Sequence, residues 1–111
     1  MDKETEEKIT QLQILEQNLQ ASLIQKQNFQ GQLNEVENAL KELEKNKKEV
    51  YKITGNIMVL ANKTELKQEL EEKKDTTTLR IKKLEKQERE LQEKTSKIQK
   101  EVMQTLQQQK K

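Results

Sequence analysis

The chain has 111 residues, of which 30% are hydrophobic, 2% aromatic and 38% charged, and its formal net charge is +2. So little apolar material cannot build a compact globular core of ordinary thickness. The composition is typical of either a disordered chain or a long coiled coil, and the spacing of the apolar residues decides between them.

The residue types also limit the chemistry. The chain has no Cys and no His, which excludes thiol nucleophiles, disulfides, imidazole bases and the usual zinc ligands. Carboxylates remain, but they are spread along charged segments without a Gly-rich loop, so we expect no enzyme and no catalytic, cofactor or metal site. No apolar stretch approaches the roughly 20 residues of a membrane span, and we expect a soluble cytoplasmic protein.

The first long segment, residues 4–49, follows a seven-residue frame that is typical of a coiled-coil helix. Position a of this frame holds Leu12, Leu19, Leu33 and Leu40, and position d holds Leu15, Phe29, Val36, Leu43 and Val50. Ser22, Lys26 and Lys47 interrupt the apolar seam. Gly31 falls on the outer side of the predicted helix, where it costs about 1 kcal/mol relative to Ala.

The second long segment, residues 63–108, has a frame of its own and predicts a second helix. Its d positions hold Leu70, Leu84, Leu91 and Ile98, and its a positions include Ile81 and Val102. This seam is thinner, because Lys74, Thr77, Glu88 and Thr95 also fall on it. Asn62 followed by Glu65 resembles a capping box, with Thr64 as a competing cap, so the helix should begin between residues 62 and 64.

Residues 50–61, VYKITGNIMVLA, separate the two helical segments and predict a β-hairpin. The Gly55-Asn56 pair suits a type II′ or type I′ turn between β-forming residues. Strand alternation then places Tyr51, Ile53, Met58 and Leu60 on one wholly apolar face. The two helices must run antiparallel, and symmetry about Gly55 opposes a positions with d positions, as in an antiparallel coiled coil.

A lone two-stranded hairpin is only marginally stable in water and has two unpaired edges. One interpretation is that the hairpin folds back and caps the end of the coiled coil. The other is that several hairpins join edge to edge into a closed sheet, which would remove the edges and bury the apolar face together. The predicted fold is therefore mainly α, a long antiparallel coiled-coil hairpin with a β-hairpin at the connection, whose hairpins assemble into an intersubunit β-barrel.

Two stretches carry a resemblance to a known family. E-V-Y-K-x-x-G-N-I-x-V, from Glu49 to Val59, and R-I-K-K-L-E-K-Q-E-R-E-L, from Arg80 to Leu91, together with the order helix, hairpin, helix, resemble archaeal-type beta subunits of the prefoldin family. The resemblance extends over essentially the whole chain, residues 1–111, as a single unit.

The resemblance implies an ATP-independent co-chaperone subunit in a hexamer of two alpha and four beta chains. It implies that the coiled-coil tips hold unfolded proteins and pass them to a group II chaperonin, with no nucleic-acid or membrane partner. The hairpin would then be the oligomerisation element, with Val50, Tyr51, Ile53, Gly55, Asn56, Ile57, Met58, Val59 and Leu60 as its candidate residues.

Apolar residues off the seam gather toward the outer ends of both helices. In the first frame Ile9 and Leu23 fall at e, Ile14 at c and Ile24 at f, and in the second helix Met103 and Leu106 lie off the seam. Exposed aliphatic residues at one end of a rod mark an interaction site. The candidate client-binding residues are Ile9, Leu12, Ile14, Leu15, Leu19, Leu23, Val102, Met103 and Leu106.

Other interpretations stay open at this point. Ile9 and Leu23 share one helix side with Leu12 and Leu19, so they also fit a broad apolar stripe that is simply buried. A structural or tethering coiled coil without chaperone activity is the alternative function. A nucleic-acid-binding arm is a weaker alternative, because the charge is close to balanced.

Overall fold

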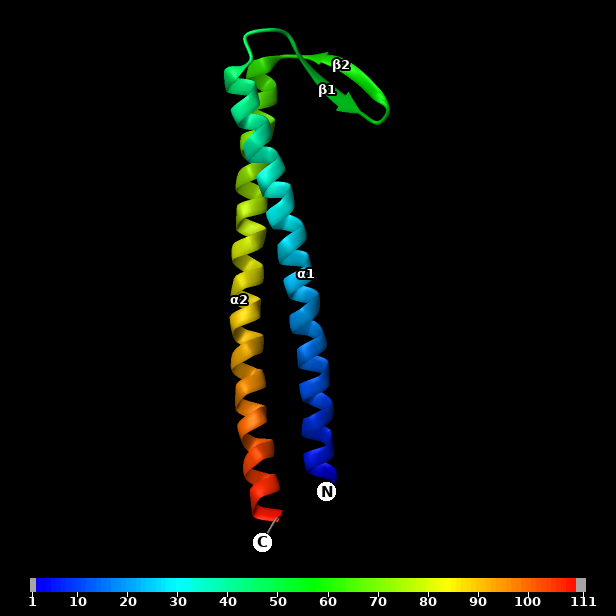
Figure 1. Ribbon diagram of the computed structural model, residues 1–111, viewed down its shortest axis with the longest axis vertical. Coiled ribbons are helices and arrows are strands. Elements are labelled where there is room, and N and C mark those ends of the chain that lie inside the picture. Colours follow the sequence, from blue (N-terminus) through cyan, green and yellow to red (C-terminus); the bar gives the residue numbers. More distant parts are fainter. Residues whose placement is uncertain (1, 110–111) are drawn as a thin grey trace. The chain divides into compact units, whose positions relative to one another are not determined.

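The computed structural model describes residues 2–109. The chain forms α1 (Lys3–Lys45), β1 (Val50–Thr54), β2 (Ile57–Ala61) and α2 (Lys63–Gln109), in that order (Figure 1). Contacts group the chain into two compact units. Unit 2 is Asn28–Ile81, and unit 1 combines Met1–Gln27 with Lys82–Lys111. In each unit a stretch of α1 runs antiparallel to a stretch of α2, so the predicted mainly α fold with a β-hairpin between two antiparallel helices is confirmed.

The predicted seams are the buried sides of the helices. Buried and half-buried residues of α1 recur at alternating steps of three and four, which is the heptad pattern of a coiled coil. In unit 2 these residues are Phe29, Leu33, Val36, Leu40 and Leu43, which face Leu66, Leu70, Lys74, Thr77 and Ile81 of α2. In unit 1 they are Leu12, Leu15, Leu19, Ser22 and Lys26, with Leu84, Glu88, Leu91, Thr95, Ile98 and Val102 on α2.

The seam of α2 departs from the predicted frame at its first turns. The frame places Lys67 at an a position, but the structure exposes Lys67 and half-buries Leu66. Leu66, Leu70 and Lys74 follow one another at steps of four, which locally unwinds a coiled coil. The apolar side chain therefore takes the inner position and the charged one stays in water.

The first helix is shorter than the predicted segment 4–49, because α1 ends at Lys45. The Asn46 amide still donates to the carbonyl of Glu42 at 3.0 Å. The Asn46 side chain, however, accepts a hydrogen bond from the Lys48 amide at 2.9 Å, and Lys63 Nζ donates to the Asn46 carbonyl at 2.7 Å. Because Asn readily bonds backbone two residues on, it diverts the chain out of the helix.

The start of α2 has the predicted cap. The Glu65 amide donates to Asn62 Oδ1 at 3.1 Å, and the Leu66 amide donates to the Asn62 carbonyl at 2.9 Å. Asn62 thus satisfies donors that the first turn of a helix otherwise leaves open. Thr64, the competing candidate, lies inside the helix.

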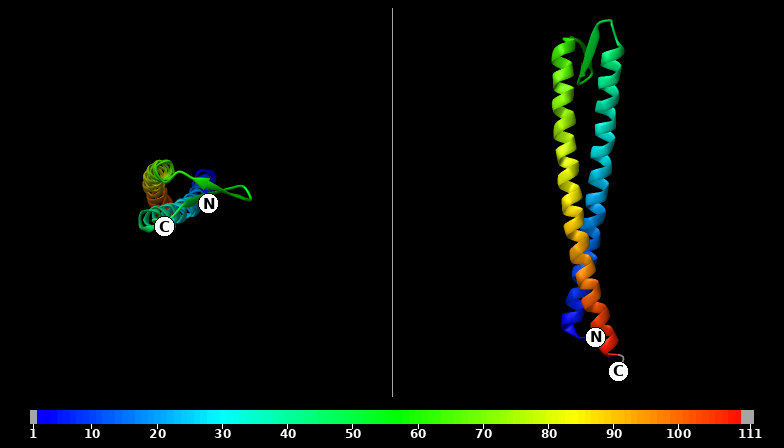
Figure 2. Two further views of the ribbon diagram at one scale, coloured as in Figure 1. Left: turned by 90° about the horizontal axis from the view of Figure 1, so that it is seen from above. Right: turned by 90° about the vertical axis from the view of Figure 1, so that its left-hand side faces the viewer.

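The hairpin has the predicted register, with Val50 opposite Ala61, Lys52 opposite Val59 and Thr54 opposite Ile57. Gly55 has a φ of 61°, and no described residue other than glycine has a positive φ. A type I′ turn needs positive φ at both central residues, whereas type II′ needs it only at the first. The turn is therefore type II′. In Figure 1, and from above in Figure 2, the hairpin projects to one side of the helix ends of unit 2.

The two glycines offer a matched test of this backbone assignment, because a Cβ at either would meet nothing within 4 Å. Gly31→Ala should raise the free energy of unfolding by about 1 kcal/mol, since it lies mid-helix. Gly55→Ala should lower it by about 1 to 2 kcal/mol, since a Cβ is strained at positive φ. Denaturant unfolding of both variants checks the signs, and a stabilising Gly55→Ala would contradict the type II′ turn.

Candidate functional site

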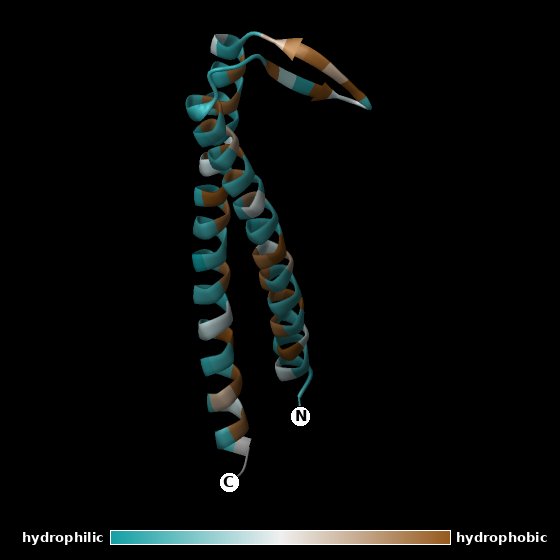
Figure 3. Ribbon diagram, turned by 45° about the horizontal axis from the view of Figure 1, so that its top comes forward, coloured by the Kyte–Doolittle hydropathy of each residue, from teal (hydrophilic) through white to brown (hydrophobic). Residues whose placement is uncertain are grey.

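The hairpin carries large apolar side chains that the chain itself leaves uncovered. Ile53 is 70% exposed, Met58 68%, Leu60 59% and Tyr51 53%, and all four lie on the predicted apolar face. The opposite face is also apolar in part, with Ile57 and Val59 exposed. Figure 3 draws β2 almost entirely in hydrophobic colour, whereas β1 is interrupted by a hydrophilic segment. The hairpin thus presents one wholly apolar face and a second face on which Ile57 and Val59 lie beside Lys52 and Thr54.

Only the base of the hairpin is packed. Val50 is buried, and its partner Ala61 is half-buried. Farther along β1, Lys52 Nζ contacts Glu69 Oε2 of α2 at 2.8 Å, and the Tyr51 hydroxyl donates to Glu49 at 3.2 Å. Both contacts are exposed, where such pairs contribute about 1 kcal/mol or less. Of the two, only the Lys52–Glu69 contact joins the hairpin to a helix, and both add little stability.

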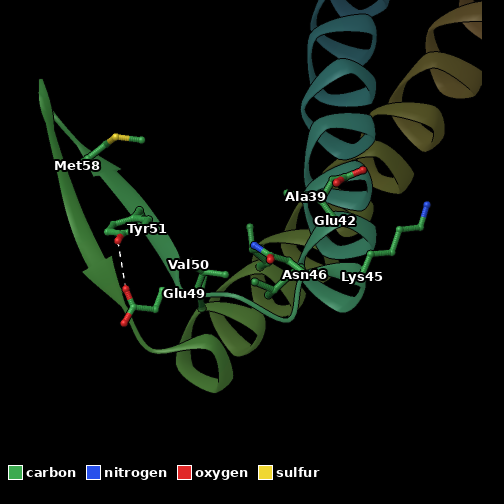
Figure 4. Close-up of a pocket in the computed structure, with 11 residues that line it drawn as sticks. Ala39, Glu42, Lys45, Asn46, Glu49, Val50, Tyr51 and Met58 are labelled. Carbon is green, nitrogen blue, oxygen red and sulfur yellow. Dashed lines mark hydrogen bonds between the residues drawn. The ribbon is translucent and has the colours of Figure 1, made fainter.

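A groove of about 610 Å³ connects the apolar face of the hairpin with the helices of unit 2. Its apolar lining consists of Ala39, Leu43, Val50, Tyr51, Met58, Leu66 and Leu70. Figure 4 shows Tyr51 and Met58 on the hairpin, with Ala39 and Asn46 from the α1 side. Sequence reasoning missed this groove, and the only signal for it was the spacing of Leu66 and Leu70, which places both on one side of α2.

The second group of exposed apolar residues lies in unit 1. Figure 1 places the first turn of α1 and the last turn of α2 at the same end of this unit. Ile24 is 58% exposed, Met103 57% and Ile14 52%, and Leu23 is exposed as well. Leu19 and Leu23 line a shallow surface hollow with glutamine side chains, and Met103 borders another on α2. Apolar and polar side chains alternate here, which leaves apolar surface in small, separate areas.

The other predicted tip residues are less accessible. Ile9, Leu12, Leu15, Leu19 and Leu106 are half-buried, so Ile9 belongs to the broader stripe that sequence reasoning offered as an alternative. Val102 is 7% exposed and lies on the seam. A partner could touch Val102 only where the two helices separate.

The seam of unit 1 is interrupted by polar groups. Lys26 Nζ contacts Glu88 Oε2 at 3.1 Å, and Thr95 donates to the Leu91 carbonyl at 2.7 Å. Ser22 is buried, and among the described residues its hydroxyl has no hydrogen-bond partner. A buried polar group without a partner costs about 1 to 3 kcal/mol. This stretch of seam is therefore held less strongly than an all-leucine seam would be.

The first turn of α1 is capped by Asp2, whose Oδ1 accepts a hydrogen bond from the Thr5 amide at 2.8 Å. Hydrogen bonds from the Thr5 side chain and amide lower the pKa of the Asp2 carboxyl below its usual 3.8. Lys8 then bridges Glu4 of α1 and Glu101 of α2, at 3.9 and 3.5 Å. The surface at this end of unit 1 therefore carries several charged side chains, and the exposed apolar residues lie among them.

Leu79 is a further exposed apolar residue that sequence reasoning did not single out. It is 66% exposed on α2 within unit 2. Its neighbour Arg80 is also exposed, and the Arg80 guanidinium lies 5.5 Å from the centre of the Phe29 ring, a distance typical of a cation–π contact. Leu79 belongs to unit 2, whereas Ile14, Ile24 and Met103 belong to unit 1.

Comparison with known proteins agrees with these features. A sequence model of the family described as prefoldin subunit matches residues 6–109. Prefoldin subunit beta of Archaeoglobus fulgidus is 41% identical over 100 residues, 88% of this chain and 86% of that protein. Prefoldin subunit beta of Methanothrix thermoacetophila is 36% identical over 105 residues, 93% of this chain and 88% of that protein.

A solved structure is similar over nearly the whole chain. The crystal structure of the prefoldin beta subunit from Thermococcus strain KS-1 has a TM-score of 0.87 and 33% identity, and the match covers 95% of this chain and 94% of that one. The chain belongs to the prefoldin family, a non-enzymatic chaperone family, and its relatives are archaeal beta subunits. Among the described residues, no helix is long and apolar enough to cross a membrane.

Proposed function

We propose that this chain is one subunit of a cytoplasmic, ATP-independent chaperone that holds unfolded proteins and delivers them to a group II chaperonin. The assembly is a hexamer of two alpha and four beta chains, as the family resemblance implies. The observation that carries the proposal is that the exposed large apolar side chains other than Leu79 fall into two groups. One group is on the hairpin, around Ile53 and Met58, and the other is in unit 1, around Ile14 and Met103.

The hairpin group supports the assembly role. Its apolar face is continuous across both strands, and two strands alone have no second layer to cover it. Joining several hairpins into a closed barrel would pair the free edges and enclose Tyr51, Ile53, Met58 and Leu60. Each large apolar side chain moved out of water contributes about 1.5 to 3 kcal/mol when its burial is complete.

The unit 1 group supports the client role. Its apolar side chains are separated by charged and glutamine residues, so no single area is large enough for tight binding by itself. Unfolded chains expose scattered apolar residues, and flexible Met103 accepts varied partners. Several weak sites on one assembly raise the effective concentration of each next contact, so capture is strong overall while each contact still releases.

The client role predicts a defined loss of function. Ile14→Ser with Met103→Ser should reduce suppression of client aggregation several-fold, because both side chains are more than half exposed in unit 1. Leu79→Ser is the matched control, since Leu79 is exposed even more but belongs to unit 2. Light scattering of a denatured client during refolding measures the effect. Unchanged suppression by the double variant, at unchanged oligomeric mass, would remove the client assignment.

The assembly role predicts that a single charge added to the apolar face of the hairpin dissociates the oligomer. Ile53→Asp should convert the oligomer to single chains, because a carboxylate would be enclosed in the shared sheet without a partner. Thr54→Asp is the control, since it adds the same charge to the next residue on the opposite face. Native mass spectrometry measures the oligomeric mass of both variants, alone and with an alpha chain. An Ile53→Asp protein of full oligomeric mass would refute the role of this face.

A further inference from the structure

The two edges of the hairpin differ in charge. β2, Ile57–Ala61, reads Ile-Met-Val-Leu-Ala and has no charged residue, whereas β1 carries Lys52 at its centre. Lysine on an edge strand is a common device against pairing with another strand. Lys52 is also engaged, because Glu69 holds its ammonium at 2.8 Å. The unprotected edge of this hairpin is therefore β2.

The turn determines which backbone groups of β2 point outward. A tight turn pairs the Thr54 carbonyl with the Ile57 amide, so residues 54 and 57 form a hydrogen-bonded pair. Hydrogen-bonded and non-hydrogen-bonded pairs alternate along an antiparallel ladder. Val59 and Ala61 therefore bond inward to β1, and the backbone groups of Met58 and Leu60 face away from it.

We propose that β2 pairs edge to edge, antiparallel, with β2 of a second copy of this chain, with Val59 opposite Val59 of the second copy. This inference rests on the proposed assembly role and specifies the edge, the partner and the register. Met58 then lies opposite Leu60 of the second copy. By the two-fold symmetry, Leu60 lies opposite Met58 of the second copy. Every outward backbone group of these two residues gains a partner, which gives four hydrogen bonds across the two-fold axis.

The register also joins the apolar faces of the two hairpins. Tyr51 and Leu60 of one copy form one row across the sheet with Met58 and Ile53 of the other copy. All four side chains lie on the same face of their own hairpin. Cross-strand pairs of aromatic and large aliphatic side chains stabilise a sheet by about 0.2 to 1 kcal/mol each. The result is a four-stranded sheet with one unbroken apolar face.

Pairing through β1 lacks these features. A two-fold β1 pair centred on residue 52 would set two lysines directly opposite each other, and like charges in that position are destabilising. Pairing β1 of one copy with β2 of the next is heterologous and adds chains without a two-fold axis. In both arrangements Lys52 would lie in a ladder between two copies of this chain, whereas the β2 pair leaves β1 and its Lys52 for the other chains of the proposed barrel.

Cysteine cross-linking tests the register, because the chain has no native Cys. In the proposed pair, residue 59 faces itself across a non-hydrogen-bonded position with a Cα separation of about 4.5 Å, within disulfide range. Val59→Cys, mildly oxidised at concentrations where the unmodified chain is oligomeric, should give a covalent dimer in high yield. Met58→Cys alone should give little, but mixed with Leu60→Cys it should give the mixed dimer.

The outcomes separate this inference from the assembly role. If Val59→Cys keeps its oligomeric mass but forms no disulfide, the β2 register is wrong while the assembly role stands. If Val59→Cys joins instead to Lys52→Cys, which is also at an exposed position, the edges pair heterologously and the inference is overturned. If the unmodified chain is a single chain both alone and with an alpha chain, the assembly role itself fails.

Discussion

Two antiparallel strands cannot bury their own apolar faces, and the rest of this structure depends on that constraint. Tyr51, Ile53, Met58 and Leu60 are all more than half exposed, although they form one continuous face. Such a surface persists in water only if something covers it. The helices of unit 2 supply only a base for the hairpin, through Val50 and Ala61, and leave the remainder uncovered.

The helices, unlike the hairpin, bury or half-bury most of their own apolar side chains. In a chain with 38% charged residues the helices contain few apolar side chains, and the heptad places most of those in the helices on a single seam. Polar side chains occupy several seam positions, and Lys26 with Glu88 is the clearest case. Some apolar residues remain outside the seam and are exposed, among them Ile14 and Met103, and these are the residues to which the client role is proposed.

Much of this fold could be predicted because its signals are local. The heptad steps identified the seam, Gly55 identified the turn, and Asn62 identified the start of α2. The end of α1 was placed too late, because the frame was extended past Asn46, whose side chain bonds the Lys48 amide and whose carbonyl is bonded by Lys63 from the other helix. Leu66 was missed on the seam because a strict seven-residue frame does not allow the local unwinding found there.

The candidate sites were predicted less completely than the fold. Alternation along the strands was enough to find the apolar face of the hairpin, since each side chain follows from the register. The groove beside it combines residues of both helices and both strands, so it depends on how the base of the hairpin packs. Val102 was proposed for the client surface although its seam position buries it, which shows that proximity to the chain end is a weaker guide than heptad position.

Amide hydrogen exchange of the hairpin, followed as the protein is diluted from oligomer to single chains, tests the central claim most directly. If other chains complete this sheet, the outward-facing amides of Met58 and Leu60 should be protected in the oligomer and exchange rapidly on dilution. The amide of Leu40, inside α1, should change far less. Equal exchange of Met58 and Leu60 in the oligomer and in the single chain would contradict the account.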